Sequence, residues 1–273
     1  MPLISKSAFV ASTTVLIASS IFMTSASATT LLAAHRAVYD VKLKEASDRS
    51  GIDGMNGRIV YEFRGSACDG YTTNFRFVTR LSARGEINMT DQRTSTFEDG
   101  AGENFRFVTK TYVNENEDKS IEGSAKSQDG AVIVDLKSPE PLELDLNSAL
   151  FPTKHVLDLI DRARAGETFY EQQIFDGSDG GDRVLTTTVV IGPQKSEPTE
   201  DAADETLEGE PYRNVSVAYF DEVNDPEGLP EYSIAFKLHD NGISRDLEMD
   251  YGDFVLTGEM TSLELFEPET CDG

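Results

Sequence analysis

Apolar and polar residues alternate with a period of two along most of the chain after residue 34. The runs HRAVYDVKL, GRIVYEFRG and YTTNFRFVTRL place aromatic and aliphatic side chains at every second position. Successive side chains of a strand point to opposite faces of its sheet, so this alternation predicts strands with one buried face. Gly, Asn, Asp and Ser separate the runs, which is typical of antiparallel β structure.

The pattern continues to the C-terminus and predicts a mainly β domain of about 14 strands. The further strands are expected at residues 86–90, 93–97, 103–113, 119–127, 131–137, 167–175, 183–191, 213–220, 232–238, 243–251 and 254–265. An antiparallel sheet of this size must curl, close or split into two layers.

One segment departs from the period of two and predicts a helix over residues 153–165. Thr153 is the expected N-cap, and Gly166 follows the last turn as a C-terminal stop. Its apolar stripe consists of Val156, Leu159, Ile160 and Ala163. A single amphipathic helix among many strands must place this stripe on the sheet, most simply by filling its concave side.

The N-terminus predicts export. Lys6 precedes an apolar run from Ala8 to Met23, and small residues follow with an Ala26-x-Ala28 motif. We therefore expect a cleavable signal peptide at residues 1–28 and one mature domain at 29–273. A retained membrane anchor is the competing interpretation, but the apolar run is shorter than the roughly 20 residues that a span needs.

The chain has two cysteines, Cys68 and Cys271. In an exported protein such a pair is expected to form a structural disulfide. A redox-active or metal-binding pair is the alternative, which the lack of a C-x-x-C motif disfavours.

Acidic residues dominate the charge, with 49 Asp and Glu against 24 Lys and Arg and a formal net charge of −25. Such a chain repels phosphate backbones, so nucleic acid is excluded as a partner. The charge indicates solubility rather than a dedicated cation-binding surface. Acidic residues concentrate at about 193–211, where we expect a mobile loop joining two strands within the domain rather than a domain boundary.

Catalytic and cofactor motifs are absent: the chain has no nucleophile elbow, no zinc-protease motif, no P-loop and no dinucleotide fingerprint. The stretch DGSDGGD, residues 176–182, offers oxygen ligands on a glycine scaffold but is better explained as a turn. His155 is expected to serve the structure rather than catalysis. The sequence thus predicts a protein that is no enzyme, with no cofactor and no metal.

One heptapeptide occurs twice, as NFRFVTR at residues 74–80 and NFRFVTK at 104–110. If one strand runs between the two copies, they share a direction and place their phenylalanines on one face. Candidate ligand-contacting residues are therefore Phe75, Phe77, Phe105 and Phe107, with Val156, Leu159 and Ile160 of the helix. Arg76 and Arg106 would lie on the other face, either as a paired anion site or, more simply, in cross-strand pairs with Asp and Glu.

Several phrases resemble the EipB family of cell-envelope integrity proteins: AHRAVYDVKL, YEFRGSACDGYTTNFRF, FPTKHVLDLI, FDGSDGG, VSVAYFD and YGDFVLTGEMTSLELFEPETC. The resemblance covers essentially the whole mature chain, and Cys68 and Cys271 match the disulfide pair of the family. It implies a periplasmic protein with a β-spiral or broken barrel around one helix, similar to lipoprotein carriers and sensors of the LolA, LolB and RseB type. The long acidic insert after Pro193 departs from the family.

The resemblance also implies a hydrophobic cavity for a lipid, an acyl chain or a lipoprotein, with other periplasmic envelope proteins as partners. The leading hypothesis is a non-enzymatic envelope-integrity protein that binds such a ligand. Its alternatives are a structural scaffold whose interior is simply core and, less favoured, a periplasmic hydrolase that uses His155.

Overall fold

The computed structural model describes residues 32–196, 206–221, 228–269 and 271 as one mainly β fold. The predicted signal peptide and the central part of the predicted acidic loop lie outside these residues. The elements in chain order are β1 His35–Ala46, β2 Ile52–Ser66, β3 Gly70–Ala83, β4 Glu86–Glu98, β5 Asn104–Val113, β6 Asn116–Gln128, β7 Ala131–Ser138, β8 Leu142–Asn147, α1 Pro152–Ala165, β9 Phe169–Ile174, β10 Leu185–Lys195, β11 Tyr212–Phe220, β12 Tyr232–His239, β13 Ser244–Asp250 and β14 Phe254–Leu265.

The 14 strands form one continuous antiparallel sheet in the order β8-β7-β6-β5-β4-β3-β2-β1-β14-β13-β12-β11-β10-β9. The two halves of the chain are therefore each a meander, and they join where β1 pairs with β14. The segment that follows β8 meets β9, the strand at the other edge of the sheet, through an isolated parallel bridge between Leu150 and Ile174. The predicted curling of a large antiparallel sheet is confirmed.

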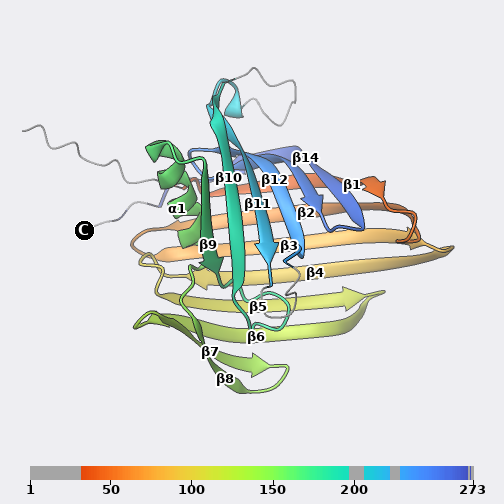
Figure 1. The fold of residues 1–273 in the computed structure, drawn as a ribbon, viewed down its shortest axis with the longest axis horizontal. Coiled ribbons are helices and arrows are strands. Elements are labelled where there is room, and N and C mark those ends of the chain that lie inside the picture. Colours follow the sequence, from red (N-terminus) through yellow and green to blue (C-terminus); the bar gives the residue numbers. More distant parts are fainter. Residues whose placement is uncertain (1–31, 197–205, 222–227, 270, 272–273) are drawn as a thin grey trace, which may run out of the picture.

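The sheet folds over so that its second half faces its first. Figure 1 shows β9 to β12 running across β2 to β6, with α1 at one end of the crossing strands. The apolar stripe of α1 packs on inward-facing residues of β9 to β12, as expected for a helix on the concave side. Within the described ranges, no helix is both long and apolar enough to span a bilayer.

The predicted strand set is confirmed in most places and wrong at two. The stretch 86–98, predicted as two short strands, is the single strand β4, and β8 was not among the predicted runs. The inward face of β4 carries hydroxyl and amide side chains where other strands carry apolar ones, so its alternation is hard to recognise. Those inward residues are Asn88, Thr90, Gln92, Thr94 and Thr96.

Three apolar clusters fill the space between the two halves. The first gathers residues of β5 to β8 around Phe151 and Phe175, the second lies along the β1–β14 seam, and the third joins α1 to β9–β12. Ile234 of β12 packs against both the second and the third cluster. The core is therefore continuous across the second half of the sheet.

Candidate ligand-binding face

The two copies of the repeated heptapeptide lie on β3 and β5, which run in the same direction on either side of β4. Their phenylalanines share the inner face, as predicted. Their register is different from the simplest expectation, because Phe75 lies in one cross-strand row with Thr109, through Thr94, and not with Phe105. The copies are thus offset by four positions, which is about 13 Å along a strand.

Phe105 and Phe107 belong to the closed first cluster, where each is 1% exposed. The Phe105 ring stacks on that of Phe151 at 5.2 Å between centroids, and the Phe107 ring meets Phe175 edge-on at 5.7 Å. The loop 176–182 covers this cluster, since a Cβ on Gly177 would lie 2.5 Å from the Phe107 ring. In this conformation Phe105 and Phe107 are part of the hydrophobic core. That they contact a ligand stays a prediction.

Phe75 and Phe77 are half-buried and pack against the second cluster. Other apolar side chains at inward positions of the neighbouring strands are half-buried too, although they face the inside of the sheet. They are Leu43, Met55, Ile234, Phe236, Leu247 and Phe254. We call this set, with Phe75 and Phe77, the inner apolar face. The side chains of this set are partly covered by the core clusters and retain some exposed apolar surface.

The helix residues predicted to line the site divide in the same way. Leu159 and Ile160 are buried in the third cluster, with 2% and 1% exposure. Val156 is half-buried at the edge of that cluster. Of the three, Val156 has side-chain surface left for a ligand.

Helix α1 begins one residue earlier than predicted and is not capped by Thr153. Its N-cap is Phe151, which offers no side-chain hydrogen bond, and Pro152 opens the first turn. Instead, the carboxylate of Glu98 on β4 accepts hydrogen bonds from the backbone N–H groups of Thr153, at 2.7 Å, and Lys154, at 2.8 Å. Burial raises the pKa of the Glu98 carboxyl, and the two N–H donors oppose that rise. A strand residue thus fixes the helix start.

Arg76 and Arg106 do not form a paired cationic site. Arg76 donates two hydrogen bonds of 2.9 Å to the Asp91 carboxylate, which also receives Arg93 and whose pKa falls to about 2. Arg106 stacks on the Phe97 ring at 4.6 Å. The simpler expectation of cross-strand pairing holds for Arg76, and the four-position offset separates the two guanidinium groups.

His155 lies inside the fold, with 4% exposure, and its Nε2 has no hydrogen-bond partner. Burial lowers its pKa to about 4, so the imidazole is neutral at pH 7. The imidazole is therefore shielded from solvent in this conformation.

The stretch DGSDGGD forms a turn between β9 and β10, and Asp179 in it forms an ion pair with Arg183. In the described part of the chain, no three His, Cys, Asp or Glu side chains gather closely enough to hold a metal ion.

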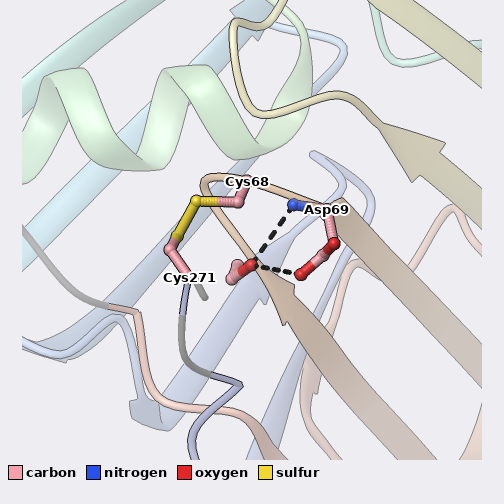
Figure 2. The surroundings of a disulfide bond; sticks show 4 residues. Cys68, Asp69 and Cys271 are labelled. Atoms are coloured by element: carbon pink, nitrogen blue, oxygen red, sulfur yellow. Dashed lines mark hydrogen bonds between the residues drawn. A yellow bond between two sulfur atoms is a disulfide. The ribbon is translucent and has the colours of Figure 1, made fainter. Parts of the chain in front are cut away.

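The predicted disulfide is confirmed. Cys68 and Cys271 are bonded with their Cα atoms 5.7 Å apart across a sequence separation of 203. Figure 2 shows the bond joining the β2–β3 turn to the C-terminal segment. The Ser66 hydroxyl donates to the Asp69 carboxylate at 2.9 Å and accepts from the Asp69 N–H at 3.3 Å, which braces this turn.

The described surface includes two hollows. One, of about 430 Å³, is lined from β4 to β7 by residues that include Phe97, Arg106 and Val108. The other, of about 310 Å³, lies against β9 and β10 and has a polar lining that includes Gln172 and Thr186. Neither is lined by the inner apolar face.

Comparison with known proteins gives one consistent picture. The family model described as EipB-like matches residues 26–267. The chain is 44% identical over 248 residues to the "Cell envelope integrity protein EipB" of Brucella abortus (strain 2308), covering 89% of this chain and 88% of the relative. It is also similar to a crystal structure of a beta-barrel-like DUF1849 protein from Brucella abortus, with a TM-score of 0.85 and 46% identity over 87% of this chain and 100% of that one.

Proposed function

The chain belongs to the EipB-like family, as its sequence resemblance indicated, and on that premise we propose that it maintains cell-envelope integrity as a non-enzymatic periplasmic protein. Its inner apolar face binds a lipid or the acyl chains of a lipidated partner. The proposal is supported by the similarity to a protein named for envelope integrity and by the sequence features of a signal peptide at residues 1–28.

One observation carries the binding part of the proposal: the inner apolar face is only partly buried, whereas the first cluster is closed. A scaffold with no ligand would be expected to cover all of its inward apolar side chains, because each buried CH₂ group contributes about 0.8 kcal/mol. Side chains such as Phe77 and Phe236 keep exposed apolar surface, and an acyl chain that covers it would gain this burial free energy.

The proposal is tested by purifying the mature chain from the periplasm, extracting it with organic solvent and analysing the extract by mass spectrometry. Binding of a fluorescent acyl probe to the stripped protein is then measured for the wild type, Phe77→Ser and Phe169→Ser. Phe169 is the matched control, because it is 58% exposed on the edge strand β9.

We expect co-purified lipid, and about tenfold weaker probe binding for Phe77→Ser because of the lost apolar contact. Phe169→Ser should bind like the wild type, and thermal unfolding of both variants reports that they are folded. A wild-type protein with neither extractable lipid nor probe binding would refute ligand binding and favour the alternative of a structural scaffold.

A further inference from the structure

One cross-strand row on the inner face begins at a buried aromatic residue and ends at an exposed lysine. Consecutive Cα partners link six residues on β1 to β6. In order they are Tyr39, Ile59, Phe77, Gln92, Thr111 and Lys119. Residues directly opposite each other in antiparallel strands project from the same face, so the six side chains share the inner side.

Exposure is greater at the Lys119 end of this row than at the Tyr39 end. Tyr39 and Ile59 are buried, Phe77, Gln92 and Thr111 are half-buried, and Lys119 is exposed. The row therefore passes from aromatic and aliphatic groups, through an amide and a hydroxyl, to an ammonium group. From Phe77 to Lys119 it crosses three inter-strand steps, or about 14 Å between Cα atoms.

The charge of Lys119 is not used elsewhere in the described structure. Its ammonium group makes no ion pair or hydrogen bond to any described residue, although the whole chain carries 49 acidic residues. Most other lysines that project from these strands are paired, as Lys110 is with Glu117 and Lys137 with Glu122. Inward-facing Arg213 on β11 is likewise held, by Asp240 at 2.6 Å.

The polar middle of the row also carries no charge. Beside Gln92 and Thr111 lie Thr94 and Thr109, whose hydroxyls are hydrogen-bonded to each other at 3.0 Å. Hydroxyl and amide groups can accept or donate to the ester, amide or hydroxyl groups next to an acyl chain. The inner face thus offers an apolar area, a neutral hydrogen-bonding strip and a terminal cation in one line.

From this order we infer that the ligand is an acyl chain with a single anionic head group, and that Lys119 binds the anion. The inference rests on the proposed function, since it places the acyl chain on the inner apolar face near Phe77. A carboxylate and a phosphate monoester share the required chemistry, because each offers oxygens to an ammonium donor. An exposed ammonium on a strand end adds selectivity for the anion more than affinity.

The experiment compares two fluorescent polyene probes on the stripped mature protein at pH 8: cis-parinaric acid and its uncharged methyl ester. The variants are Lys119→Gln and, as matched control, Lys126→Gln. Lys126 lies on the same strand, is exposed and pairs in register with Asn104, but it projects from the outer face. Both substitutions remove one positive charge.

We expect the wild type to bind the acid about fivefold more tightly than the ester, a preference typical of one exposed ion pair. Lys119→Gln should lose this preference while its affinity for the ester stays the same, and Lys126→Gln should keep it. Raising the salt concentration should reduce the preference of the wild type for the acid over the ester, because exposed ion pairs are screened. Displacement of bound cis-parinaric acid by oleic acid and by lysophosphatidic acid then distinguishes a carboxylate from a phosphate monoester as the preferred head group.

The outcomes separate the two proposals. If neither probe binds the wild type, the proposed function fails. If both bind the wild type equally, lipid binding stands and the role of Lys119 is refuted. A Lys119→Gln variant that weakens acid and ester alike, or a Lys126→Gln variant that loses the preference as well, also refutes a specific head-group contact.

Discussion

Glu98 gives the sharpest test of how the helix is attached to the sheet. Its carboxylate is 2% exposed and accepts the first two free N–H groups of α1, from Thr153 and Lys154. In Glu98→Ala both donors lose their partner. Thr153 is itself buried, so its N–H cannot turn to water, whereas Lys154 is exposed and can be rehydrated.

The magnitude follows from these two situations. A buried N–H left without a partner costs about 1–3 kcal/mol, and loss of a helix cap costs about 1 kcal/mol. Relief of the buried carboxylate, whose pKa burial raises, offsets part of this loss. We therefore expect Glu98→Ala to lower the free energy of unfolding by about 2–3 kcal/mol, with a smaller loss for Glu98→Gln, which keeps one acceptor.

Urea unfolding followed by far-UV circular dichroism measures this loss. The matched control is Glu86→Ala, because Glu86 lies on the same face of β4 and is exposed, with no ion pair to a described residue. The midpoint of the control should stay at the wild-type value. If Glu98→Ala were as stable as Glu86→Ala, the carboxylate would not be the cap that holds the helix start.

Three further changes test other parts of the fold. Cys271→Ser opens the 203-residue separation and should cost about 5 kcal/mol by chain entropy; equal urea midpoints for variant and wild type in oxidising buffer would contradict this. Gly177→Ala should cost about 3 kcal/mol, because its φ of +69° and the Phe107 ring at 2.5 Å both oppose a Cβ, while Gly130→Ala, at φ +81° with open space, should cost about 1 kcal/mol; similar losses in calorimetry would refute the ring contact. His155 is kept neutral by burial down to a pKa of about 4, whereas the unfolded chain takes up that proton below about 6.5, so stability falls as the pH drops through this window. Between pH 7 and pH 5, the free energy of unfolding of His155→Leu, measured in urea, should fall by about 2 kcal/mol less than that of the wild type. Identical dependence of this free energy on pH in the two proteins would contradict the lowered pKa of His155.

The sequence pattern predicts the elements well where one strand face is clearly apolar. Strands such as β1 and β3, and the helix α1, lie where the alternation and the helical spacing predict them. The pattern fails at β4, because threonine and glutamine on its inward face remove the contrast between the two sides. That failure marks the neutral strip of the inner face, so local ambiguity coincides here with the proposed binding surface.

The contacts that complete the site depend on distances along the chain that no local pattern encodes. Glu98 caps a helix through the N–H of Thr153, 55 positions later, and the residue spacing in neither segment predicts this contact. The same holds for the four-position offset between the repeated heptapeptides, which hairpin lengths and bulges determine. In the sequence, Lys119 is indistinguishable from other charged strand residues. Only the strand register shows that it lies in one row with Phe77.

The pairing of β1 with β14 also bears on how the chain is made. The first strand to emerge during synthesis keeps one bare edge until the last strand arrives, since its second partner is the C-terminal one. Bare strand edges are the usual route to aggregation, and long-range pairing is slow. A chain truncated before β14 would thus present an open strand edge in the middle of its future sheet.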